Sequence, residues 1–114
     1  MHELHITESI LRIALGAARD NGARRVTAID LVLGELSSVV DDSVQFYFDA
    51  LSRGTPAEGA ALRFRRVPAE ARCWDCEHVW PVRAPLPESC PRCGGLRLRV
   101  SGGQEFLVES VDVD

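Results

Sequence analysis

Four cysteines form two closely spaced pairs, in residues 73–76 and 90–93, and the chain has no others. Two intervening residues let one tight turn direct both thiolates of a pair at the same ion, and zinc binds four such ligands in a tetrahedron. A thiol–disulfide centre is the alternative for one such pair, but two pairs favour zinc. The spacing therefore predicts a structural Zn(II) site with four thiolate ligands: Cys73, Cys76, Cys90 and Cys93.

A second group of metal-binding side chains opens the chain as Met1-His2-Glu3. A terminal amine, the backbone nitrogen of residue 2 and the imidazole of His2 can chelate one ion in adjoining rings. Deprotonated backbone nitrogens suit square-planar Ni(II) or Cu(II) better than Zn(II). The alternative is that His2 is an ordinary polar residue near a frayed end of the chain.

The length of 114 residues suits one domain carrying a small insert. No stretch has the length and apolarity of a membrane span, and the first residues lack the basic and apolar regions of a signal peptide. We therefore expect a cytoplasmic protein with no membrane partner. In that reducing compartment, paired cysteines indicate zinc more strongly than disulfides.

Charge is unevenly distributed along a chain whose net charge is -4. Residues 63–99 hold eight arginines against four acidic residues, so the cysteine region is cationic before its metal is counted. Arg72 and Arg92 are expected to offset the negative charge of the thiolates. Trp74 and Trp80 are expected to form the core of the module, and a partner-binding surface is the alternative for them. The alternative is a zinc-ribbon adaptor for nucleic acid or protein, which the negative remainder of the chain disfavours.

Hydrophobic periodicity indicates five elements outside the cysteine module. A helix is expected over residues 4–21, with Gly22 at its C-terminal end, and a second helix is expected to be capped by Asp41 or Asp42 and to end near Ser52. Strands are expected at 25–36, 61–67 and 105–113, and a proline-rich loop at 81–87. This pattern predicts an α+β fold, with a small three-stranded sheet covered by two helices and an inserted zinc-ribbon-like module.

Several motifs together resemble the HypA/HybF family of hydrogenase maturation nickel metallochaperones over essentially the whole chain. They are the Met1-His2-Glu3 start, the junction at 22–26, the strand end at 34–37 and the two cysteine pairs. The resemblance implies a nickel site at His2, with the amine of Met1, neighbouring backbone nitrogens and Glu3, and structural zinc at the cysteines. It also implies delivery of Ni(II) to the large subunit of a [NiFe] hydrogenase with a HypB-type GTPase, and some members also serve urease maturation.

The chain is expected to be a carrier and not an enzyme, because it has no nucleophile–base arrangement and no phosphate-binding glycine loop. Residues 1–69 and 100–114 are expected to form a nickel-binding α/β domain, and residues 70–99 a zinc-binding module. His5 is expected to be a surface residue, although it can share a helix face with His2. His78, just after the first cysteine pair, is expected beside the metal or exposed, and no nucleic-acid partner is expected.

Overall fold

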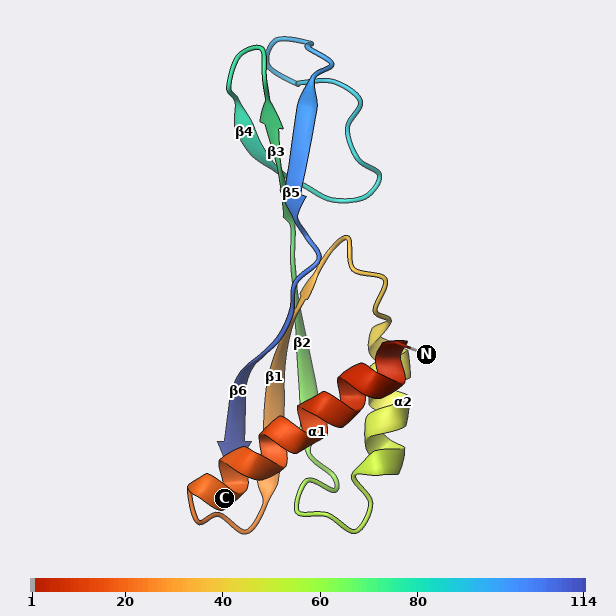
Figure 1. Ribbon diagram of the computed structural model, residues 1–114, viewed down its shortest axis with the longest axis vertical. Helices are drawn as coiled ribbons and strands as arrows, with labels where there is room; N and C mark the ends of the chain where they lie inside the picture. The colour runs from red at the N-terminus through yellow and green to blue at the C-terminus, as the bar shows by residue number, and fades with distance from the viewer. Residues whose placement is uncertain (1) are drawn as a thin grey trace. The chain divides into compact units, whose positions relative to one another are not determined.

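A computed structural model describes the backbone of residues 2–114 and the side chains of residues 3–114. Two predicted nickel ligands, Met1 and the side chain of His2, therefore lie outside the described residues. Figure 1 shows the elements in chain order: α1 (His2–Asp20), β1 (Val26–Gly34), α2 (Asp41–Leu51), β2 (Ala61–Val67), β3 (Ala69–Cys73), β4 (Val79–Val82), β5 (Leu98–Gly102) and β6 (Phe106–Val113).

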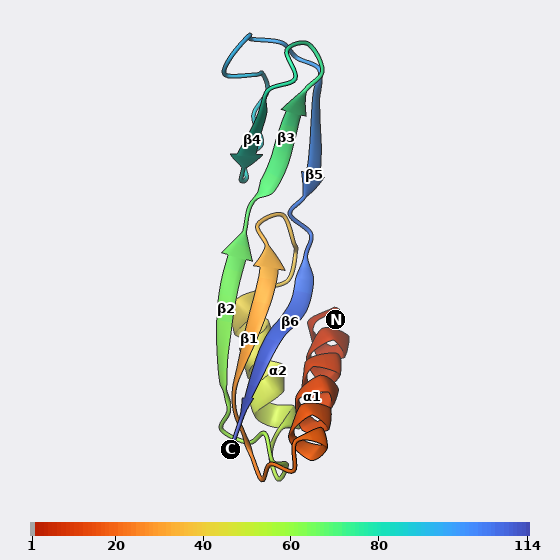
Figure 2. The ribbon, with the colours of Figure 1, turned by 90° about the vertical axis from the view of Figure 1, so that its left-hand side faces the viewer.

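The first three-stranded sheet has the order β2-β1-β6, so β1 lies in the middle. Both helices lie on one face of this sheet, as Figure 2 shows. The central position explains the nearly continuous burial of β1, in which Ile29, Leu31 and Leu33 are fully buried. The predicted α+β arrangement, with a small sheet covered by two helices, is confirmed.

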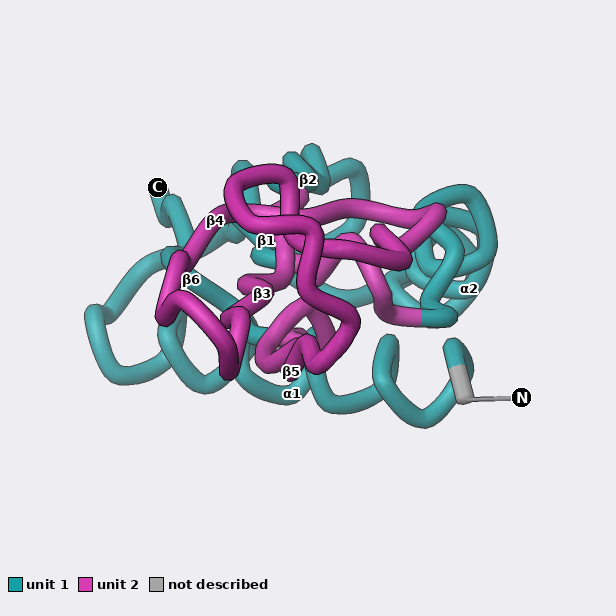
Figure 3. The backbone as a smooth tube through the Cα atoms, turned by 90° about the horizontal axis from the view of Figure 1, so that it is seen from above, with its two compact units in different colours: residues 1–32, 38–65, 107–114 teal, residues 33–37, 66–106 magenta. Residues whose placement is uncertain are grey.

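The chain divides into two compact units, which Figure 3 distinguishes by colour. The helical unit comprises residues 1–32, 38–65 and 107–114, and the cysteine unit comprises residues 33–37 and 66–106.

Helix α1 presents Ile10, Ala14 and Ala18 to the core at successive four-residue steps, and all three are buried. The helix ends as the sequence indicates. Gly22 adopts a φ of 63°, a left-handed conformation that glycine tolerates without steric cost, and the N–H of Ala23 donates to the carbonyl of Ala18 at 2.8 Å.

Helix α2 begins differently from the prediction that Asp41 or Asp42 caps it, which is wrong. The N-cap residue is Val40, which forms no side-chain cap, and both aspartates lie in the first turn. Negative charge is favoured there because the helix dipole is positive at its N-terminus. An acceptor for the backbone N–H of Val40 comes from α1, whose Glu3 carboxylate lies 3.4 Å away.

Polar side chains connect the three strands of the first sheet on the face that alternation turns away from Ile29 and Leu31. Asp30 of β1 accepts two hydrogen bonds from Arg63 of β2, at 2.7 and 2.9 Å, and one from Ser110 of β6 at 2.6 Å. Arg63 also donates to Asp112 of β6 at 2.6 Å. These bonds lower the pKa of the Asp30 carboxyl to about 2, with Arg63 as the main cause.

The cysteine unit contains a second three-stranded sheet, with the order β4-β3-β5 and antiparallel pairing. One face of this sheet forms a small core of Ala69, Ala71 and Val82. Leu36, Trp80 and Val100 are partly buried against that core. Strand β4 includes Pro81, so regular structure extends into the segment expected to be a loop.

The two tryptophans of this unit differ from expectation in one respect. Trp80 packs on the core as predicted. Trp74 does not, because its side chain lies with Arg72 and Arg99, away from the core, and is 53% exposed.

Gly34 and Gly103 bring two segments of the cysteine unit into close contact. A Cβ atom at Gly34 would overlap the carbonyl group of Gly103, so glycine is required for this approach. The N–H of Leu36 donates to the same carbonyl at 2.7 Å. The contact seats Leu36 beside the small core of the sheet.

Candidate metal centre

The two cysteine pairs form turns with the same hydrogen-bond pattern. In the first, the N–H of Glu77 donates to the carbonyl of Cys73 at 2.8 Å, and the N–H of Cys73 donates to His78 at 2.9 Å. In the second, the N–H of Gly94 donates to the carbonyl of Cys90, and the N–H of Cys90 donates to the carbonyl of Gly95, both at 2.8 Å. The residue after each second cysteine is left-handed, with a φ of 63° at Glu77 and 75° at Gly94.

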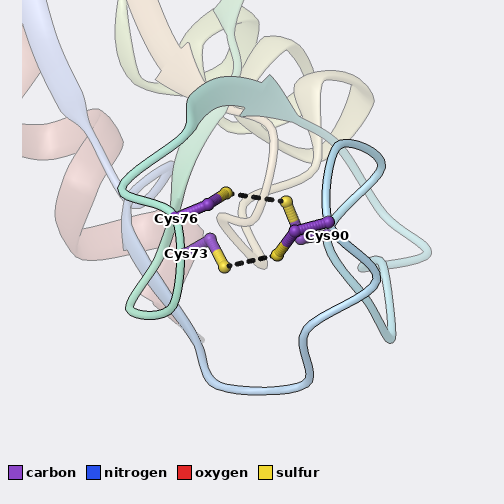
Figure 4. A group of neighbouring side chains, drawn as sticks. Cys73, Cys76 and Cys90 are labelled. Carbon is purple, nitrogen blue, oxygen red and sulfur yellow. Dashed lines mark hydrogen bonds between the residues drawn. The ribbon is translucent and has the colours of Figure 1, made fainter.

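The four sulfur atoms converge on one point, as Figure 4 shows for the labelled Cys73, Cys76 and Cys90. All four lie within 4.8 Å of one another, and the pairs Cys73–Cys93 and Cys76–Cys90 are 3.6 Å apart. A tetrahedron with Zn–S bonds of about 2.3 Å has sulfur–sulfur edges of about 3.8 Å. The thiols are therefore already spaced as zinc ligands.

Backbone amides and crowding act in opposite directions on these thiols. For Cys90, burial disfavours the thiolate, but the N–H groups of Cys93 and Arg92 and the neighbouring sulfurs together lower its pKa to about 7. For Cys93, the N–H of Gly95 favours the thiolate, but the sulfurs of Cys76 and Cys73 outweigh it and raise its pKa to about 12. Four thiolates coexist here only with a cation among them, so the donor set fits a divalent metal.

Three arginines contact residues of the two cysteine turns, although they act less directly on the thiolates than the sequence indicates. Arg92 contributes its backbone N–H, 3.4 Å from the sulfur of Cys90. Arg72 lies over the ring of Trp74. Sequence reasoning missed Arg97, which pairs with Asp75 in the first cysteine turn and whose pKa is raised by that carboxylate and, less strongly, by Cys73.

His78 turns to Trp80 instead of joining the cysteines. The two rings stack with centroids 5.0 Å apart and planes 12° from parallel. Among the described residues, the cysteines form the one group of three or more metal-binding side chains. His78 therefore supports the packing of the sheet.

Of the predicted nickel ligands, only Glu3 has a described side chain. Hydrogen bonds from its own backbone N–H and, less strongly, from that of Val40 hold the pKa of its carboxyl below the ordinary value. The Glu3 carbonyl accepts a bond from the hydroxyl of Thr7, which is fully buried. Glu3 is thereby bonded to Val40 through its carboxylate and to Thr7 through its carbonyl.

His5 is a surface residue, as predicted. Its side chain is 82% exposed, and its Nδ1 lies 3.4 Å from a carboxylate oxygen of Glu8, one helical turn away. Within the described part of the chain, no helix is both long enough and apolar enough to cross a membrane.

Comparison with known proteins gives a match along nearly the whole chain. The family model described as "Hydrogenase/urease nickel incorporation, metallochaperone, hypA" matches residues 1–113. A hydrogenase maturation factor HypA from Dehalococcoides mccartyi is 46% identical over 114 residues, which cover 100% of this chain and 95% of the relative. Another, from Geobacter metallireducens, is 41% identical and is covered completely, as is this chain.

Two solved structures share the fold. The solution structure of the Ni metallochaperone HypA from Helicobacter pylori superposes with a TM-score of 0.64 at 20% identity, covering 97% of this chain and 96% of the other. A second solution structure of a HypA protein gives a TM-score of 0.72 at 22% identity, covering 99% and 96%. At these low sequence identities, the superpositions show only that the fold is shared.

Proposed function

This chain belongs to the HypA family of hydrogenase and urease nickel-incorporation metallochaperones, and we propose that it carries Ni(II) on its first residues. The family match over residues 1–113 is the observation that carries the proposal, because it includes the Met1-His2-Glu3 start. The protein is a maturation factor and not an enzyme. Ni(II) is accordingly its cargo and undergoes no reaction on it.

The proposed nickel ligands are the amine of Met1, the backbone nitrogens that follow it, the imidazole of His2 and Glu3. A five-membered chelate ring joins the amine to the next backbone nitrogen, and the imidazole closes a second ring, which suits square-planar Ni(II). The carboxylate of Glu3 is anionic at neutral pH and lies at the start of α2, bonded to Val40. It can support the bound ion electrostatically or as a further ligand.

A nickel site at the start of a chain would suit transfer. Ligands at the start of a chain can be released one at a time while an acceptor binds the ion. The buried Thr7 and the core residue Ile10 anchor the helix behind these ligands, so the ion is presented from a fixed support.

The second metal is proposed to be structural Zn(II), held by the four cysteines. The cysteine unit has a core of three small buried side chains, which is too little to stabilise a fold by burial alone. Zinc bonds would supply the missing free energy. Four thiolates would leave zinc no open position, so this ion would not exchange with the cargo.

We assign the nickel function to residues 1–69 and 100–114 and the zinc function to residues 70–99. The proposed partners are a HypB-type GTPase and the large subunit of a [NiFe] hydrogenase, with urease maturation proteins as additional partners in some members of the family. We place the transfer in the cytoplasm, where thiols stay reduced.

The proposal is tested by nickel titration of His2→Ala, with His5→Ala as the matched control. Both variants remove one imidazole from α1, and His5 is 82% exposed and lies beside Glu8. His2→Ala is expected to lose at least tenfold in nickel affinity, while His5→Ala and the zinc content of both variants stay unchanged. Equal nickel binding by the two variants would contradict the N-terminal site.

A further inference from the structure

One face of the β4-β3-β5 sheet carries the small core, and the other, here called the outer face, is exposed. Because side chains alternate between the two faces along a strand, the strand residues of the outer face point away from the core residues Ala69, Ala71 and Val82. The outer face comprises Glu70, Arg72, Val79, Arg99 and Ser101, together with Trp74 just beyond the end of β3, and all of them are exposed.

Two arginines of the outer face lie directly opposite each other. Arg72 of β3 pairs in register with Arg99 of β5. Like charges in this position destabilise an antiparallel pair. Within residues 3–114, Arg99 has no ion-pair partner, and the single partner of Arg72 is the exposed Glu77 at 3.5 Å. A surface pair of that kind contributes little, so neither arginine is held by a strong ion pair.

An aromatic side chain adjoins this pair. Trp74 is 53% exposed, and the guanidinium carbon of Arg72 lies 5.9 Å from its ring centroid. A depression of about 210 Å³ is lined by Glu70, Arg72, Trp74, Arg99 and Ser101. That volume suits one or two side chains more than a cofactor-sized ligand. Tryptophan and arginine are also the residues that most often dominate protein–protein binding.

The charge of the surroundings identifies the occupant. The cysteine unit contains six arginines and six acidic residues, and the helical unit contains seven arginines and eleven acidic residues. The net negative charge of the chain would therefore disfavour a long polyanion, whereas a short segment with one or two carboxylates can contact the two arginines alone. Glu70 also lines the depression, so it can pair with a basic group of the same segment, next to those carboxylates.

We propose that the outer face docks a short acidic segment of a partner protein. One carboxylate bridges the guanidinium groups of Arg72 and Arg99, which bind it as charge-assisted donors, and a neighbouring apolar side chain packs on Trp74. The proposal goes beyond nickel transport, because none of these residues belongs to the proposed nickel site. It holds whether or not nickel binds at His2.

The test is selection from a displayed library of random twelve-residue peptides on the immobilised zinc-loaded protein. The expected consensus has Asp or Glu next to Leu, Ile or Phe. A selected peptide should bind Arg72→Gln/Arg99→Gln at least tenfold more weakly, and should shift the indole N–H resonance of Trp74 more than that of Trp80. Arg12→Gln/Arg53→Gln, which changes two exposed arginines of the helical unit, is the charge-matched control and should bind normally.

A stability measurement separates docking from a structural role. Removing one of two facing cations should leave the thermal midpoint of Arg99→Gln unchanged or raise it, whereas a structural arginine would lower it. The proposal is overturned if the peptides lack carboxylates or bind the double variant equally well. It is also overturned if single-stranded DNA binds through the same two arginines, or if they are needed only for a dimer of this chain.

Discussion

At the residue scale, the two cysteine turns differ most in the residue that follows each second cysteine. Glu77 and Gly94 occupy equivalent left-handed positions, at φ values of 63° and 75°. Only glycine adopts this conformation without a clash of its own Cβ, so the second turn is the less strained of the two. The spacing of the proposed zinc ligands depends on both turns.

Gly94→Ala is expected to destabilise the cysteine unit by about 1 kcal/mol, because alanine disfavours a left-handed backbone. No atom lies within 4 Å of the added Cβ, so the effect isolates the backbone conformation. Tryptophan fluorescence during urea unfolding measures it, since both tryptophans belong to this unit. A competing chelator should also remove zinc from the variant more readily.

The control is Gly16→Ala in α1, where the new Cβ would make only an ordinary contact of 3.7 Å with Arg19. Helical alanine is favoured over glycine, so this variant should be more stable by about 0.5–1 kcal/mol. Destabilisation by both substitutions to the same extent would refute the backbone explanation.

At the element scale, the bonds that Asp30 accepts from Arg63 and Ser110 join β1 to the strand on each side. The last strand, β6, returns to the sheet after the whole cysteine unit. Side-chain bonds between strands so distant in sequence help to fix its register.

Asp30→Asn is expected to lower stability at neutral pH, with a difference from the native protein that shrinks in acid. The folded-state pKa of about 2 lies below the ordinary value of 3.8. The ionised carboxylate therefore stabilises the fold above about pH 4, and this contribution is lost as the pH falls towards 2. Urea unfolding followed by helical circular dichroism measures it, because both helices belong to the helical unit.

The charge-matched control is Asp20→Asn at the exposed end of α1. Its difference from the native protein in free energy of unfolding should not shrink between pH 5 and pH 3 as that of Asp30→Asn does. A difference for Asp30→Asn that stays constant or grows in acid would show that the carboxylate is not held ionised by its partners.

The elements of the helical unit could be predicted from the sequence because each is long and strongly periodic. The apolar residues of α1 recur at helical spacing over many residues, and the apolar run of β1 is continuous, so both patterns are longer than a chance pattern. The start of α2 could not be predicted in the same way. Its N-cap is Val40, and the acceptor for the N–H of that residue comes from Glu3, far away in sequence.

Strands β3, β4 and β5 also escaped prediction, because each is four or five residues long. Their stability comes from pairing with one another and not from local preference. The cysteines, by contrast, were found from spacing alone, since a metal site imposes a local sequence rule. Arg97 and the exposed position of Trp74 carry no such local signal.

At the scale of the whole molecule, the family assigned from short motifs is confirmed by the match over residues 1–113. The two compact units provide a physical basis for the proposed division of labour. Four thiolate ligands suit an ion that stays bound, and the proposed ligands of residues 1–3 suit an ion that is transferred. The docking face of the cysteine unit would add recognition of a partner to this pair of roles.

The central claim is that the first residues of the chain hold the nickel. The most direct measurement compares nickel titrations of the native protein and of a form carrying extra residues before Met1, with zinc content determined for both. The extension converts the terminal amine into an amide, which cannot bind Ni(II) as the amine does. We predict loss of tight nickel binding with zinc unchanged; equal nickel affinity in the two forms would contradict the account.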